Sequence, residues 1–141
     1  MENNNMEKID QETLSAILKE HQLWLDSRGE NGERADLSNK SLKLANLEGA
    51  DLRKADLRRV NLEGADLLIA DLAGANLEGA NLAGANLAGA NFHRANLAET
   101  NLEGAYLRET NLAGANLAGA NLADAYLEDA YLEDAYLEDA Y

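Results

Sequence analysis

The sequence predicts an all-β solenoid, a chain that coils around its own hydrophobic core, preceded by an α-helix. From Ala35 onward a five-residue unit repeats without insertion or deletion, and unbroken periodicity of this kind indicates a repeat architecture. Residues 10–29 instead follow helical spacing. The predicted organisation is a disordered tail (1–9), a capping helix and turn (10–34) and the solenoid (35–141).

The repeating unit has leucine at its centre, alanine two residues earlier, and usually Asp or Asn between them. Residues 35–139 divide into 21 such units. On an α-helix, leucines five residues apart would wander over every face. In one straight strand an odd spacing would alternate them between faces. Each unit is therefore a short extended side followed by a bend, and the chain must coil.

Within each unit the alanine and leucine at the first and third positions face inward, and the other three face outward. A glycine at the fifth position eases the bend, because it lacks a Cβ atom. This position is glycine in many units, including Gly49, Gly64, Gly74, Gly79, Gly84 and Gly89. Nearly all leucines then enter one core, which explains how a highly charged chain can fold.

The helix predicted over residues 10–29 begins at Asp10, a preferred N-cap residue, and Gly29 would end it. Its apolar stripe consists of Leu14, Ile17, Leu18, His21 and Leu25. The first coil of a solenoid exposes its core and an unpaired strand edge. We expect the helix to cover that end, with Trp24 and Leu25 over the first leucines.

Composition excludes several classes of protein. The formal net charge is −14, and cysteine and proline are absent, so disulfide scaffolds and thiolate metal sites are excluded. No apolar run is long enough to span a membrane, and the N-terminus has no secretory signal pattern, which predicts a cytoplasmic protein. Strong negative charge disfavours nucleic acid as a partner.

The sequence carries no signal of an enzyme, a metal site or a cofactor site. His21 and His93 are too far apart in the predicted fold to converge on a metal ion. A filled solenoid offers no pocket for a nucleophile and its base. The evenly spaced glycines from Gly74 to Gly84 resemble part of a phosphate-binding loop, but they follow from the period of five.

A basic cluster in the first two coils comprises Arg53, Lys54, Arg58 and Arg59. It has two interpretations: a site for an anion or an acidic partner, or a solvated patch that pairs with Glu33, Glu48 and Glu63. The second interpretation is favoured.

Leu68 and Ile69 break the pattern, because both occupy outward positions. They are predicted to adjoin Ala88 and Gly89 on the next coil and to form a docking patch for a partner. The alternative is that the N-terminal segment covers them.

The C-terminal end is strongly acidic. Residues 101–141 hold nine acids and one base, and the unit AYLED occurs three times in succession. These units place tyrosines and carboxylates around the last coil. A candidate end interface consists of Tyr126, Tyr131, Tyr136 and Tyr141. We expect a monomer or a weak end-to-end homodimer, since the carboxylates repel one another.

The units resemble the pentapeptide repeat family, a bacterial family whose repeat is A-(D/N)-L-x-x, and are similar to its cyanobacterial members. The resemblance covers residues 35–141. It implies a right-handed, four-sided (quadrilateral) parallel β-helix with four units per coil, hence about five coils here. The family also implies an N-terminal capping helix.

Most members of the family are binding or scaffold modules or have no assigned activity, so the resemblance implies a non-catalytic structural or protein–protein interaction module that binds an unidentified protein. The alternative is an acidic DNA mimic that binds and protects DNA gyrase, as some family members do. The net charge of −14 favours the alternative. The acids of residues 101–141 ring one end instead of running along the rod, which disfavours it.

Overall fold

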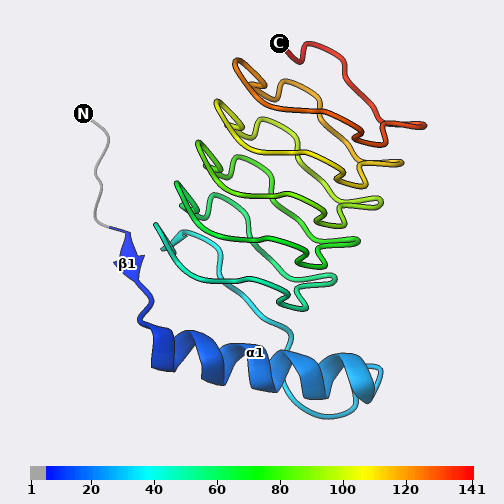
Figure 1. The fold of residues 1–141 in the computed structure, drawn as a ribbon. Coiled ribbons are helices and arrows are strands. Elements are labelled where there is room, and N and C mark those ends of the chain that lie inside the picture. The colour runs from blue at the N-terminus through cyan, green and yellow to red at the C-terminus, as the bar shows by residue number, and fades with distance from the viewer. Residues whose placement is uncertain (1–5) are drawn as a thin grey trace.

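The computed structural model describes residues 6–141. Its elements are strand β1 (Glu7–Lys8), helix α1 (Gln11–Asp26) and strand β2 (Lys40–Ser41), followed by a stack of coils that reaches the C-terminus. Helix α1 lies across one end of the stack, and the coils rise from it as a rod (Figure 1). No helix among the described residues is long and apolar enough to cross a membrane.

The coils stack in parallel with a constant register of 20 residues, as the bridges Asp36–Asp56, Asn61–Asn81 and Tyr106–Tyr126 show. Because each unit has five residues, four units complete one turn and the solenoid has four sides. Backbone hydrogen bonds join each coil to the next. In the unit that contains Leu87 these are Asn86 N to Ala65 O (2.9 Å), Leu87 N to Tyr106 O (2.8 Å) and Gly89 N to Arg108 O (2.9 Å).

Each unit ends in a tight turn whose fifth-position residue has a positive φ angle. This is the signature of a type II turn, which glycine favours. Glycine occupies nine of these positions and other residues occupy twelve, among them Leu44 (φ 61°) and Ile69 (φ 54°). A large side chain at one corner commonly lies over a glycine in the following coil: a Cβ atom built on Gly89 would be 3.3 Å from Ile69 Cγ2.

The core is a continuous column of leucines and alanines, as the inward assignment predicts. The central leucines from Leu37 to Leu117 are at most 2% exposed, and Phe92 fills the same position without exposure. Two units carry threonine in place of alanine. The buried hydroxyls of Thr100 and Thr110 donate hydrogen bonds of 2.7 Å to the carbonyl oxygens of Leu97 and Leu107.

Helix α1 begins where the sequence predicts but ends earlier. Asp10 is the N-cap, and its Oδ1 accepts a 2.7 Å bond from Thr13 N. The helix ends at Asp26, three residues before the predicted boundary. Arg28, not Gly29, takes the left-handed conformation nearest the helix end (φ 55°), and Gly29 N bonds to Trp24 O at 2.8 Å.

The contacts of α1 with the solenoid also differ from expectation. Leu14 is buried in the main core, and Ile17 and Leu18 pack against it. Trp24, predicted to cover the first leucines, instead stacks on His21 with ring centroids 5.7 Å apart. The helix therefore contacts the solenoid core mainly through its first three turns.

Strand β1 corrects the tail predicted over residues 1–9. Glu7 and Lys8 pair in parallel with Lys40 and Ser41 of β2, and the Glu7 carboxylate bonds to Lys40 Nζ at 2.5 Å. The chain thus adds a strand below the first coil before α1 begins. The remainder of the predicted tail, residues 1–5, lies outside the described residues.

Candidate docking surface

One side of the solenoid gathers exposed hydrophobic residues. We call it the Asn46 face. It consists of one unit from each coil, namely residues 45–49, 65–69, 85–89, 105–109 and 125–129. We include the two corner residues that precede each unit, namely residues 43–44, 63–64, 83–84, 103–104 and 123–124. Leu44 is 71% exposed, Ile69 61%, and Tyr106 and Tyr126 50% each. Ala88 and Gly89, as predicted, follow Leu68 and Ile69 on the next coil, where Ile69 N bonds to Ala88 O at 2.9 Å.

Ile69 is the most unusual residue of this face. A β-branched residue with a positive φ angle is a true conformational outlier, and a non-glycine residue pays about 1–2 kcal/mol for it. The side chain is nevertheless largely in solvent. Backbone strain of this kind concentrates at functional sites. With the described residues from Met6 onward in place, Ile69 remains 61% exposed; strand β1 instead pairs with Lys40 and Ser41 of β2.

The two tyrosines of the face break a second regularity. In other coils the second-position Asn and Asp side chains form a ladder: Asn86 Nδ2 donates to Asp66 Oδ1 of the preceding coil at 3.3 Å. Within its own unit, Asn86 Oδ1 accepts from Ala88 N at 3.2 Å. Tyr106 follows Asn86 in the stack, and a phenol cannot continue that ladder. Tyr106 and Tyr126 stack on each other instead, with ring centroids 5.0 Å apart and an interplanar angle of 4°.

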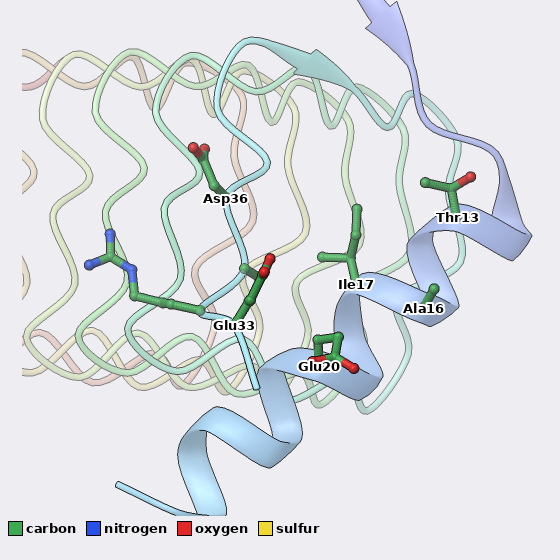
Figure 2. A pocket seen from close by; sticks show the side chains of 8 residues that line it. Thr13, Ala16, Ile17, Glu20, Glu33 and Asp36 are labelled. Atoms are coloured by element: carbon green, nitrogen blue, oxygen red, sulfur yellow. The ribbon is translucent and has the colours of Figure 1, made fainter. Parts of the chain in front are cut away.

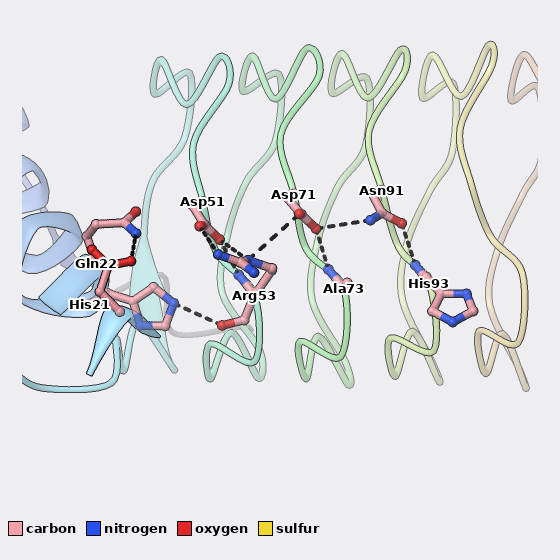
Figure 3. Close-up of polar contacts among 9 residues, drawn as sticks. His21, Gln22, Asp51, Arg53, Asp71, Ala73, Asn91 and His93 are labelled. Carbon is pink, nitrogen blue, oxygen red and sulfur yellow. Dashed lines mark hydrogen bonds and ion pairs between the residues drawn. The ribbon is translucent and has the colours of Figure 1, made fainter. Parts of the chain in front are cut away.

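His21 connects α1 to the solenoid (Figure 3). It is fully buried. Its Nδ1 accepts a 2.9 Å bond from Ala35 N, and its Nε2 lies 2.9 Å from Arg53 O. Nδ1 must therefore be unprotonated, and the proton on Nε2 is donated to the carbonyl oxygen. Burial lowers the pKa of His21 below its usual value.

The basic cluster predicted around Arg53 and Arg58 is divided between two corners, and the predicted pairing with glutamates is wrong. Arg53 forms an ion pair with Asp51 of its own unit (Nη2–Oδ2 2.7 Å), and Arg58 forms the equivalent ion pair with Asp56 (Nη2–Oδ2 2.6 Å). Hydrogen bonds from each arginine lower the pKa of its aspartate. Figure 3 shows polar contacts from Arg53 to Asp71 and from Asp71 to Asn91, which lie on successive coils.

A pocket of about 300 Å³ lies between α1 and the chain that enters the first coil (Figure 2). Its lining residues are Thr13, Ala16, Ile17, Glu20, Glu33, Arg34, Ala35 and Asp36. Charges of both signs line it, and no group of His, Cys, Asp or Glu among residues 6–141 could hold a metal ion. The pocket offers no recognisable chemistry.

The tyrosines of the candidate end interface lie on different sides. Tyr126 stacks above Tyr106, whereas Tyr131 bridges to Asn111 and Tyr136 to Asn116. Tyr131, Tyr136 and Tyr141 are 68%, 51% and 72% exposed. They surround the last coil and do not share one face, as the four-sided register dictates.

The comparison with family models agrees with this architecture. A model of pentapeptide repeats matches residues 33–67, 70–108 and 100–139, with 8 copies. The chain belongs to the pentapeptide repeat family. Proteins of this family form right-handed quadrilateral β-helices. A comparison with curated protein sequences finds no match.

Two solved structures are similar over most of the solenoid. A pentapeptide repeat protein from the cyanobacterium Cyanothece 51142 (Rfr23) has 42% identity and a TM-score of 0.60; the match covers 60% of this chain and 58% of that protein. A pentapeptide repeat protein of the Arabidopsis thaliana thylakoid lumen has 37% identity and a TM-score of 0.55, over 67% and 70% of the two chains.

The plasmid-mediated fluoroquinolone resistance protein QnrB1 is more distant. It has 20% identity and a TM-score of 0.47, over 81% of this chain and 69% of its own. That likeness is too low to bear on function.

Sequence reasoning found Leu68 and Ile69 but missed the surface to which they belong. A signal was present: with a period of 20 residues, Tyr106 and Tyr126 fall on the same side as Leu68. Leu44 occupies the preceding corner and escaped notice, because its unit departs from the consensus at several positions. The apolar stripe already placed His21 on the side of the helix that faces the solenoid, but its contact with Arg53 O had no sequence signal.

Proposed function

We propose that this pentapeptide repeat protein is a non-catalytic module that binds another protein through the Leu68–Ile69 patch of the Asn46 face. The observation that carries the proposal is Ile69 itself. Its left-handed backbone (φ 54°) is costly for a β-branched side chain, and 61% of its surface is exposed. A residue that strains the fold and remains in solvent is best explained by a contact outside the chain.

The test separates stability from binding. Ile69→Gly removes the strain, since glycine is the commonest fifth-position residue of this solenoid. We expect an equal or higher melting temperature, together with loss of the proteins captured by the full chain from an extract of its source cells. Lys54→Gly is the matched control: Lys54 also has a positive φ angle (62°) but lies at another corner. It should keep the captured proteins.

Capture that is unchanged in a folded Ile69→Gly variant would contradict the proposal. A strongly destabilised Ile69→Gly variant would show that Ile69 serves the fold, through its contact with Gly89, and would also contradict it.

The alternative function, protection of DNA gyrase by DNA mimicry, is supported only by the net charge of −14. Nine of the 26 acids lie in residues 101–141 with a single base, so the charge does not run evenly along the rod as in duplex DNA. Supercoiling by gyrase, measured with a quinolone and with or without the chain, decides between the two. Protection would favour the mimic.

A further inference from the structure

We propose that the Asn46 face binds a basic, amphipathic α-helix of the partner, lying along the solenoid axis. This inference rests on the proposed function and names the chemistry of the partner. It follows from three properties of the face: its exposed apolar side chains, the saturation of its backbone, and the sign of the charges around it.

The apolar side chains lie across the width of the face: Leu44 at the corner that precedes it, Tyr106 and Tyr126 at second positions, and Ile69 at the corner that ends it. Among the described residues from 35 to 126, the exposed large hydrophobic residues are Leu44, Ile69, Tyr106 and Tyr126. All four lie on this face or at its edge. Gly89 follows Ile69 in the stack, and Asn86 precedes Tyr106. Because residues 85–89 expose no large apolar or charged side chain, an elongated ligand could contact both Ile69 and the tyrosines.

The backbone of the face excludes an extended peptide. Strand addition requires free N–H and C=O groups, but here the neighbouring coils use them. At the middle coil, Asn86 N bonds to Ala65 O (2.9 Å), Leu67 N to Asn86 O (2.8 Å) and Leu87 N to Tyr106 O (2.8 Å). A ligand on this face must satisfy its own backbone, as a helix does.

The spacing of these side chains along the rod axis matches a helix. The tyrosine ring centroids are 5.0 Å apart, and one helical turn rises about 5.4 Å. Ile69 lies two coils before Tyr106, about 9.5 Å along the axis at the usual strand spacing, and is displaced across the face from the two tyrosines. Residues i and i+7 of a helix are about 10.5 Å apart on one face. A helix of about 13 residues spans the five units of the face.

The charges select a basic partner. The face and its corners carry eight carboxylates and two bases. Both bases are offset by neighbouring acids: Lys43 lies 3.7 Å from Glu63 and Arg108 lies 3.4 Å from Glu109. The acids are Glu48, Glu63, Asp66, Glu103, Glu109, Asp124, Glu128 and Asp129. Two copies of this face would repel each other, so a second copy of the chain does not fit it.

The experiment uses two synthetic peptides of lysine and leucine, each about 15 residues long, enough to cover the face. One places its leucines on a single helical face; its isomer has the same composition with the leucines spread around the helix. Binding to the full chain is followed by fluorescence anisotropy at physiological salt. We expect the amphipathic peptide to bind at least about 10-fold more tightly, since apolar anchors dominate such contacts.

Two matched variants locate the binding site. Tyr126→Asn on the Asn46 face and Tyr136→Asn on another face change the same residue type at nearly equal exposure, 50% and 51%, and both restore the common second-position residue. Tyr126→Asn should weaken the amphipathic peptide about 5-fold or more, as loss of an aromatic anchor does. Tyr136→Asn should change its affinity little.

Equal binding of the two peptides, or equal effects of the two variants, would show attraction by charge alone and would overturn the inference. A concentration-dependent dimer of the wild-type chain in sedimentation that Tyr126→Asn abolishes would assign the face to a second copy instead. If neither peptide binds while the capture of proteins from the extract still depends on Ile69, the proposed function stands and only the helical partner is rejected.

Discussion

His21 connects helix α1 to two parts of the solenoid at once. Its ring accepts from Ala35 N and donates to Arg53 O while it is fully buried. A proton on Nδ1 would place two donors opposite each other and bury a charge. Burial has the largest effect on the pKa of His21 and lowers it; the hydrogen bond to Arg53 O and the Asp51 carboxylate favour the charged ring, and the charges of Arg34 and Arg53 disfavour it.

The consequence is a loss of stability in mild acid. The folded-state pKa of His21 is lowered, so the unfolded chain binds this proton first, near pH 6.5. The stabilisation is complete above that pH and declines as the pH falls toward the folded-state pKa. We expect the melting temperature to fall between about pH 7 and 5.5, as measured by circular dichroism.

His21→Gln should be less stable at neutral pH and should lose this part of the pH dependence. The control is His93→Gln, which replaces the exposed histidine and should retain the wild-type profile. A profile that is the same in His21→Gln and the wild type would contradict this role of His21.

Leu87 and Ala88 test the inward and outward positions of one unit. Leu87 is fully buried between two coils, and Leu87→Ala should cost about 2–5 kcal/mol, as other buried leucine truncations do. Ala88 is half-buried on the outside, and Ala88→Ser should cost almost nothing. Chemical denaturation measures both; similar losses in the two variants would mean that the assignment is wrong.

At the scale of single residues, the sequence predicted which side chains face inward better than it predicted which side chains form ion pairs. The inward leucines follow from the repeat alone, since each occupies the same place in its unit. The pairing of Arg58 with Asp56 could not be predicted against its rivals, because several acids were within reach. The positive φ angle of Ile69 was hidden, because isoleucine is a residue that normally avoids it.

At the scale of elements, the N-terminal segment covers the first coil in two ways. Leu14 of α1 enters the core, and β1 pairs with β2 through Glu7 and Lys8. An exposed strand edge promotes association with other chains. The short strand occupies part of this edge, and we propose that the helix protects the end of the core.

Deletion of residues 1–29 should expose the end of the core and the strand edge of the first coil. We expect the truncated chain to melt at a lower temperature and to self-associate, as measured by light scattering. Deletion of residues 1–5, which precede β1, is the control and should behave like the full chain. A truncated chain that stays monodisperse and equally stable would contradict the capping role.

Elements with a strong periodic signal were the ones that could be predicted. The repeat specified the coil, and Asp10 specified the start of α1. The end of α1 was misplaced because Gly29 marks a usual helix stop, whereas Arg28 already takes the left-handed conformation. Strand β1 has two residues and no pattern of its own; its pairing depends on the edge that β2 presents.

At the scale of the whole molecule, the charge is unevenly distributed along the rod. Seven acids and no base lie between Asp124 and Asp139. The same region exposes Leu132 (38%) and Leu137 (43%) along with its tyrosines. Apolar contact area and like-charge repulsion therefore oppose each other at this end of the 141-residue chain.

Neutralising these acids should change the balance. A variant with Asn and Gln in place of the seven acids should form end-to-end dimers in sedimentation velocity at neutral pH, while the parent stays monomeric. High salt should move the parent weakly in the same direction, because it screens the repulsion. A monomeric neutralised variant would show that the acids do not guard this end, and a tight dimer of the parent would make the end an assembly interface.

The constant register of the coils also limits how such a protein can lengthen. One added unit advances everything after it by a quarter turn, because four units of five residues close each coil. The core should tolerate this, since all sides present leucine and alanine to the interior. The exterior loses its alignment: after the addition of one unit between Ile69 and Tyr106, both tyrosines would leave the side that carries Ile69. The addition of single units therefore keeps the rod but changes which residues share a side. Only the addition of whole coils of four units keeps both the rod and the alignment of its surface residues.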